Sequence, residues 1–232
     1  MGPAGIPQQM PQQAGERPAR RVVRHLGADD RSSQRVRIVD AALRRLATHG
    51  LRKTTLDDVA REAGISRATL YRTFPGGKEA VLAAVVETET ARFFSGLAVV
   101  MGDAGDLEDV LVAGMVEAAR RLSEHRALVY LLTHEPEVVS PWMAFGGMDR
   151  LLLAASDFAA PFFGRWLEPD QAARAAEWGV RIVLSYLAAP TRGSDLTDPD
   201  QARHLVSTFV LPGITALRND VASSATQPRR KQ

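Results

Sequence analysis

Cysteine is absent from this chain of 232 residues. Its absence excludes disulfide bonds, thiolate metal sites and cysteine nucleophiles, and it is consistent with a reducing compartment. Long apolar runs are missing too, since no stretch reaches the about 18 residues that a membrane-spanning helix needs. Residues 1–15 are rich in Pro, Gln and Gly without an apolar run, unlike a signal peptide. We therefore expect a cytoplasmic protein.

The sequence signatures of common enzyme classes are also missing. No GxGxxG, GxxxxGK[ST], GxSxG or HExxH pattern occurs, and the nearest approach, HEPEV at residues 134–138, lacks the second His. The five His residues are scattered, which does not indicate a metal cluster. We expect no catalytic residue, no metal and no cofactor, and we expect His134, Glu135 and Glu137 to be exposed loop charges.

Charge is divided unevenly along the chain, although the net charge is only +2. Residues 1–78 hold 15 Lys+Arg against 7 Asp+Glu, whereas residues 79–232 hold 14 against 20. Such asymmetry suggests an N-terminal part that meets a polyanion, although a basic end can also be merely solvated.

Apolar residues recur at spacings of three and four, and no convincing period-two strand is present, so we expect an all-α chain of about nine helices. We predict a disordered basic arm over residues 1–31 and a flexible tail over residues 219–232. The arm could enter a DNA minor groove or act only as a solubilising leader. Its arginines are Arg17, Arg20, Arg21, Arg24 and Arg31.

Two predicted helices follow this arm. The first runs from Ser33, a good N-cap, to His49, and Gly50 is placed to end it. The second begins at Thr55, which with Asp58 three residues later fits a capping box.

A third helix follows after a linker of only two residues, 64–65, with Ser66 as its N-cap. Because the linker is so short, the second and third helices must cross steeply, as in a helix-turn-helix. Leu70 and Phe74 are available as anchors. The side chains left largely outward are Arg67, Ala68, Thr69, Tyr71, Arg72 and Thr73. Such guanidinium and hydroxyl groups suit guanine edges and phosphate oxygens.

The stretch TTLDDVAREAGISRATLYRTFPGGKEAVLAAV, residues 54–85, resembles the DNA-binding signature of the TetR/AcrR family of bacterial transcriptional regulators. The resemblance covers roughly residues 33–86, and beyond them only the all-helical layout is similar. One difference is that Gly76 and Gly77 both stand before Lys78, where the family's commonest version has a single residue.

The resemblance implies specific roles for eight residues. Phosphate contacts are implied for Thr55, Tyr71 and Lys78, base-edge contacts for Arg67, Ala68 and Thr69, and positions along the groove for Arg72 and Thr73. We expect Arg67 to contribute most to specificity, because it lies near the N-terminus of the recognition helix. Tyr71 could instead be a partly buried core aromatic, and Arg72 a solvated charge.

The rest of the chain is predicted to form a larger helical domain. We expect domains over residues 32–77, for DNA binding, and 78–218, for effector binding and dimerisation. A long helix should start at Lys78, Asp106 with Asp109 should cap the next helix, and Asp198 should cap the last.

Aromatic and Met residues gather in this domain and either pack its core or line an adaptable pocket for an apolar molecule. The pocket candidates are Met115, Trp142, Phe145, Met148, Phe158, Phe162, Trp166 and Trp178. The family resemblance implies a ligand cavity here and a homodimer formed by the last two helices. Its interface candidates are Trp178, Ile182, Leu205 and Phe209.

These observations together predict a sequence-specific DNA-binding regulator. We expect a homodimeric repressor on double-stranded DNA, released from a palindromic operator by an apolar small-molecule effector, with the helix from Lys78 as transmitter. The alternatives are a helical carrier of an apolar molecule without DNA function, and a nonspecific DNA-binding protein.

Overall fold

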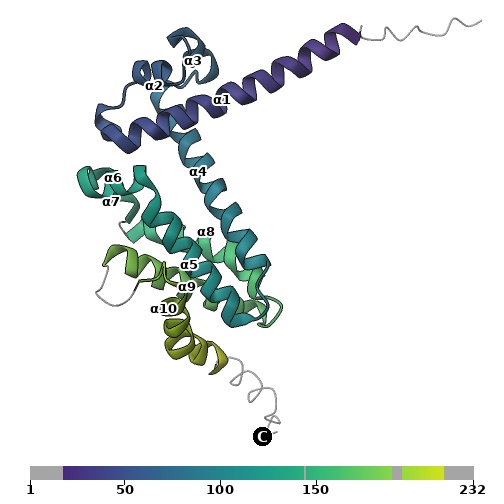
Figure 1. Cartoon of the computed structure of the whole chain (residues 1–232), viewed down its shortest axis with the longest axis vertical. Helices are drawn as coiled ribbons and strands as arrows, with labels where there is room; N and C mark the ends of the chain where they lie inside the picture. Colours follow the sequence, from purple (N-terminus) through teal and green to yellow (C-terminus); the bar gives the residue numbers. More distant parts are fainter. Residues whose placement is uncertain (1–17, 144, 190–194, 217–232) are drawn as a thin grey trace, which may run out of the picture.

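The computed structural model describes residues 18–143, 145–189 and 195–216, with side chains described from residue 32 onward except 141–148. Every regular element in these ranges is a helix, as predicted (Figure 1). The helices are α1 Pro18–Lys53, α2 Leu56–Glu62, α3 Arg67–Thr73, α4 Gly77–Gly102, α5 Leu107–Glu124, α6 Arg126–His134, α7 Pro136–Met143, α8 Phe145–Phe163, α9 Pro169–Ala188 and α10 Pro199–Leu205, followed by a π-helical turn over Val206–Val210. None of the helices described is both long and apolar enough to cross a membrane.

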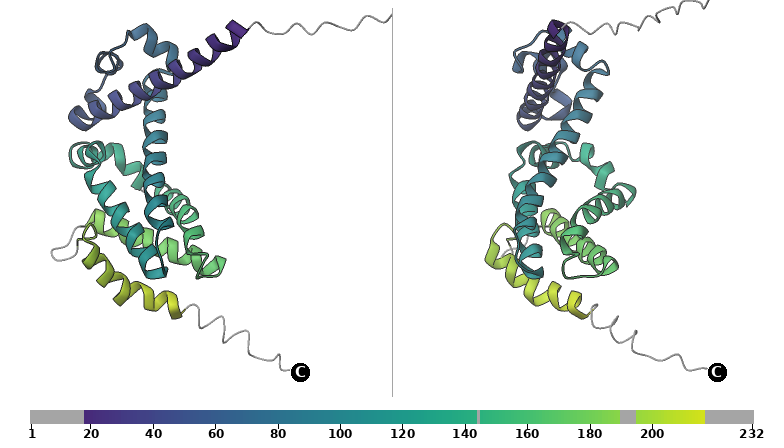
Figure 2. Two further views of the ribbon diagram at one scale, coloured as in Figure 1. Left: turned by 45° about the vertical axis from the view of Figure 1, so that its right-hand side comes forward. Right: turned by 90° about the vertical axis from the view of Figure 1, so that its right-hand side faces the viewer.

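Two apolar clusters organise the chain. The first joins α1, α2 and α3 with the start of α4 and with Ala127 of α6, and its most deeply buried members include Ile38, Leu70 and Phe74. The second joins the end of α4 with α5, α8, α9 and α10 around Leu111 and Met115. Both views of Figure 2 show α4 running from α1 into the larger body, with α10 farthest from α1. Because α4 contributes to both clusters, it connects the two bodies by packing as well as by sequence.

The prediction of a disordered arm is wrong for residues 18–31, which form the first turns of α1. Pro18 suits the first helical turn, and the Ala, Arg and Leu residues that follow are strong helix formers. Nothing therefore stops the helix before Ser33, which is not an N-cap. Residues 1–17 and the predicted tail over 219–232 lie outside the described residues.

The predicted caps of four helices are present. Thr55 and Asp58 form a reciprocal capping box at α2, and the Ser66 hydroxyl accepts from the Thr69 N–H at α3. The carboxylates of Asp106 and Asp198 cap α5 and α10. These contacts span only two or three residues, which is why local sequence predicts them.

The chain departs from helical geometry at Gly50, whose φ of 74° and ψ of −178° break α1 before its last three residues. Close behind this break lies Glu135, which is only 7% exposed. The expectation that Glu135 is an exposed loop charge is therefore wrong. His134 and Glu137 on either side are exposed as predicted, but they lie in α6 and α7 rather than in a loop. The physical reason is a set of hydrogen bonds to α1 that no local pattern encodes.

Candidate nucleic-acid interface

Helix α3 is anchored by its apolar side and presents its polar side to solvent. Leu70 and Phe74 are buried in the cluster shared with α1 and α4. Arg67, Ala68 and Arg72 are exposed on the same helix. Tyr71 is 39% exposed and does not belong to this buried cluster. The arrangement gives a short, firmly held helix whose free face carries guanidinium and phenol groups, as major-groove recognition requires.

Helix α2 begins at Thr55, an exposed residue whose hydroxyl donates to the Asp58 carboxylate over 2.6 Å. This hydrogen bond, aided by the nearby Arg45 and Arg61, lowers the pKa of Asp58 below its usual value although burial opposes the shift. A carboxylate with a lowered pKa stabilises the fold above its unfolded pKa and loses that contribution as pH falls through the folded pKa. The capping box that positions Thr55 is therefore complete at neutral pH.

Arg67 is held in place by two neighbours. Its Nη1 lies 3.0 Å from Oδ2 of Asp57 on α2, and its guanidinium carbon lies 5.5 Å from the ring centroid of Tyr71. A hydrogen bond with Tyr71 and the charge of Asp57 both raise the pKa of Arg67. To reach a base edge, Arg67 would have to leave Asp57, a surface pair that costs little to break.

Thr69 and Thr73 are less exposed than the largely outward positions that the sequence predicts. Thr69 is half-buried and takes part in the Ser66 cap. Thr73 is also half-buried, and its hydroxyl lies 2.9 Å from the Thr69 carbonyl and 3.1 Å from Oε1 of Gln34 on α1. Thr73 therefore helps to join α3 to α1 rather than projecting freely from it.

Lys78, in the first turn of α4, is half-buried. Its Nζ donates to the Leu51 carbonyl over 2.8 Å, directly beyond the break in α1. An ammonium group carries three hydrogens, so this bond leaves capacity for a phosphate. The ammonium group of Lys78, which follows the two glycines, is therefore held by a hydrogen bond near the C-terminal end of α1.

The predicted pocket residues separate into different environments. Met115 is buried in the larger cluster, and Phe158 lies 4.5 Å from Phe94 and 5.3 Å from Phe162, centroid to centroid. Trp166 is half-buried beside Arg165. The side chains of Trp142, Phe145 and Met148 lie outside the described residues.

Trp178 is 61% exposed on α9 and is therefore too open to line an enclosed pocket within one chain. It remains a candidate for the dimer interface together with Phe209, which is 74% exposed on the π-helical turn after α10. Ile182 on α9 and Leu205 at the end of α10 are half-buried. Large exposed aromatics on neighbouring surface helices are typical of a surface that another chain covers.

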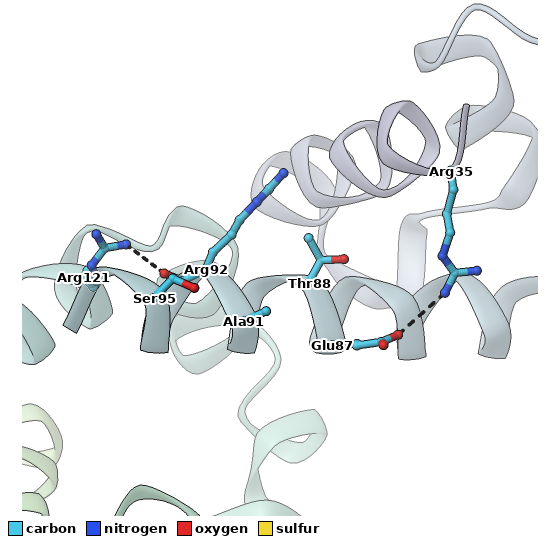
Figure 3. Close-up of a pocket in the computed structure, with 7 residues that line it drawn as sticks. All are labelled: Arg35, Glu87, Thr88, Ala91, Arg92, Ser95 and Arg121. Carbon is cyan, nitrogen blue, oxygen red and sulfur yellow. Dashed lines mark hydrogen bonds and ion pairs between the residues drawn. The ribbon is translucent and has the colours of Figure 1, made fainter. Parts of the chain in front are cut away.

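A groove of about 660 Å³ lies beside α4 where α1 crosses it (Figure 3). Most of its lining residues are polar or charged, and its charged groups are paired: Arg35 lies 3.6 Å from Glu87, and Arg92 donates to Asp40 of α1 over 2.9 Å. None of the described residues that line this groove is one of the predicted pocket residues.

Comparison with known proteins agrees with this geometry. Residues 38–85 match the family model described as bacterial regulatory proteins of the tetR family. An uncharacterised HTH-type transcriptional regulator of Mycobacterium tuberculosis is 31% identical over 182 residues, which cover 77% of this chain and 84% of that protein.

Two solved structures share the fold. The TetR family repressor AlkX from a Dietzia strain, implicated in biodegradation of n-alkanes, is 26% identical with a TM-score of 0.50, covering 78% of this chain and 95% of AlkX. A transcriptional regulator from Streptomyces coelicolor is 16% identical with a TM-score of 0.55, covering 76% of this chain and 98% of that one. The match to the latter concerns the fold alone.

Proposed function

Because this chain belongs to the TetR family of bacterial transcriptional regulators, we propose that it is a homodimeric, sequence-specific repressor, not an enzyme, that acts in the cytoplasm and leaves a palindromic operator when an apolar molecule binds. The observation that carries the proposal is helix α3, held from behind by Leu70 and Phe74 with Arg67, Tyr71 and Arg72 on its free side. Thr55 and Lys78 flank this helix as the proposed phosphate contacts.

Arg67 is the proposed base-reading side chain, and its replacement tests the proposal. Wild-type protein should enrich one palindromic sequence from a pool of random DNA duplexes at physiological salt. Arg67→Ala should bind that sequence about tenfold to a hundredfold more weakly and lose preference at one position in each half-site. Binding titrations and the sequences of the enriched duplexes measure both effects.

Arg44→Ala is the matched control for Arg67→Ala. Arg44 is an exposed arginine of the same body whose Nε contacts Glu62 of α2 over 2.8 Å, much as Arg67 contacts Asp57. We expect Arg44→Ala to keep both the enriched sequence and its affinity. Enrichment of no sequence, with salt-sensitive binding to all duplexes, would point to a nonspecific DNA-binding protein. If the protein bound none of the duplexes, the result would favour a carrier of an apolar molecule.

The proposed effector site is the interior of the larger body, around Met115, Phe158 and Phe162. Met and aromatic side chains can repack around ligands of different shape, which suits an apolar effector. The 26% identity with AlkX, which is implicated in n-alkane biodegradation, makes linear alkanes and related long-chain compounds the first molecules to screen against the protein–DNA complex. Release of DNA would identify an effector of this class.

The proposed dimer is formed by α9 and by α10 with the π-helical turn that follows it, through Trp178, Ile182, Leu205 and Phe209. Two recognition helices about 34–36 Å apart can address successive major grooves on one face of DNA, which explains why a dimer suits a palindrome. The exposed Trp178 and Phe209 on these segments support the assignment.

Phe209→Asp should weaken dimerisation by about thirtyfold or more, because it places a charge in an apolar contact. Sedimentation velocity over a range of protein concentrations measures the monomer–dimer equilibrium. Val86→Asp is the control, since Val86 is exposed to a similar degree but lies on α4, outside the proposed interface. An unchanged equilibrium in Phe209→Asp would place the interface elsewhere.

A further inference from the structure

The carboxylate of Glu135, at the junction of α6 and α7, caps the broken end of α1. Oε2 of Glu135 accepts the Leu51 N–H over 2.8 Å and lies 3.3 Å from the Arg52 nitrogen, with Oε1 also 3.3 Å from the latter. Glu135 is 84 residues from Leu51 in sequence, so the contact joins the α6–α7 junction to the end of α1, beside the packing of Ala127 of α6 in the first apolar cluster. A nearly buried carboxylate that accepts two amide hydrogens makes stronger bonds than a neutral acceptor would.

The break at Gly50 creates the need for this cap. The left-handed φ of Gly50 turns the chain out of the helix, so the next two N–H groups need acceptors outside α1. Thr54 donates to the Gly50 carbonyl over 2.6 Å, and Lys78 donates to the Leu51 carbonyl. The end of α1 is thus held at two kinds of backbone group. Glu135 accepts hydrogen bonds from its amides, and Lys78 of α4 donates one to a carbonyl.

Helix α6 is fixed at its other end as well. His125, its N-cap, accepts the Leu128 N–H at Nδ1 over 3.1 Å, and its Nε2 lies 3.1 Å from the Glu89 carboxylate on α4. At the far end, Tyr130 stacks on His134 next to Gly50. Helix α6 therefore contacts α4 at its N-terminal end and the end of α1 at its C-terminal end.

From this geometry we infer that Glu135 is a positioning residue that couples the larger body to the DNA-binding surface through α6. Only three residues separate Leu51 from Thr55, the N-cap of α2, so the carboxylate controls where α2 and α3 stand relative to the larger body. The inference rests on the proposed function. It adds a second connection between effector binding and DNA binding, through α6 and α1, to the one through α4, which joins the two parts in sequence. By linkage, DNA bound at α3 must then stabilise α6.

Hydrogen exchange followed by mass spectrometry tests the coupling without any effector. The probe is a duplex that wild-type protein selects from a random pool, and the peptides of interest cover residues 51–54 and α6. Without DNA, exchange at the Leu51 and Arg52 amides should be about tenfold or more faster in Glu135→Ala than in wild type. With DNA, α6 should gain protection in wild type but not in Glu135→Ala, while α2 and α3 gain it in both.

Glu135→Gln and Glu137→Gln make the test specific. Gln keeps one acceptor oxygen at position 135, so Glu135→Gln should be intermediate, and it remains informative if Glu135→Ala does not fold. Glu137 is exposed and contacts the Arg52 side chain over 2.7 Å, so Glu137→Gln removes a neighbouring charge without touching the cap and should match wild type.

Three results would overturn the inference. The first is unchanged exchange at Leu51 and Arg52 in both Glu135 variants, and the second is DNA-induced protection of α6 that persists in them. The third is an equal loss of that protection in Glu137→Gln. If wild-type protein selects no duplex, the proposed function and the coupling fail together, whereas the DNA-free exchange still reports whether the cap exists.

Discussion

Phe74→Ala is expected to unfold the DNA-binding part of the chain and to abolish DNA binding. Phe74 is 2% exposed at the C-terminal end of α3, and the guanidinium of Arg35 lies 4.7 Å from its ring centroid. Removing a buried Phe side chain costs about 3–5 kcal/mol in transfer free energy and cavity formation. A body of about 50 residues has a free energy of unfolding of the same order, so the loss is expected to be decisive.

Tyr71→Ala separates this structural effect from a loss of DNA contacts. Tyr71 lies on the same helix but is far more exposed than Phe74. Its removal should leave the unfolding transition, followed by circular dichroism and calorimetry, close to that of wild type while weakening DNA binding. If Phe74→Ala melted like wild type, the packing of α3 against α1 and α4 would differ from that described.

The helix ends of the DNA-binding part could be predicted because they depend on neighbours two or three residues away. Thr55 with Asp58, and Ser66 with Thr69, form the bonds that their spacing predicts. The anchoring of α3 by Leu70 and Phe74 likewise follows from helical periodicity. Whether the exposed residues contact phosphates and bases as the family resemblance implies stays a prediction.

The contacts that sequence reasoning missed link residues far apart along the chain. Thr73 meets Gln34, Lys78 meets Leu51, and Glu135 meets the end of α1. Only tertiary packing brings these groups together, so composition around each residue carries no signal for them. The sequence predicted a helix end at Gly50 and an exposed loop charge at Glu135 as two separate features, and nothing in either pattern indicated that they meet.

Exposed aromatic residues illustrate a different limit. The sequence predicted Trp178 both for the ligand pocket and for the dimer interface, because an apolar aromatic side chain suits either site. Its 61% exposure on α9 distinguishes the two within one chain. Periodicity could not, since it gives the face of a helix but not whether that face meets the core or a second copy.

Gly50→Ala is expected to destabilise both the DNA-binding part and its attachment to the larger body. At φ 74° and ψ −178° a residue with a Cβ is strained by about 1–3 kcal/mol. An added Cβ would also collide with Oε1 of Glu135 and would lie 2.7 Å from Cε1 of Tyr130. Thermal unfolding should begin at lower temperature, and exchange at Leu51 and Arg52 should accelerate. Gly102→Ala, where no atom lies within 4 Å of the added Cβ, should change neither measurement appreciably.

The double variant Gly50→Ala with Glu135→Ala distinguishes the two causes of this loss. If the collision with Glu135 dominates, removing that side chain relieves it, and the double variant should be less destabilised than the sum of the single variants. If backbone strain dominates, the two effects should add, because φ stays unfavourable whatever residue occupies position 135. A less-than-additive result is expected, since the carboxylate and the glycine occupy the same small space and each makes the other necessary.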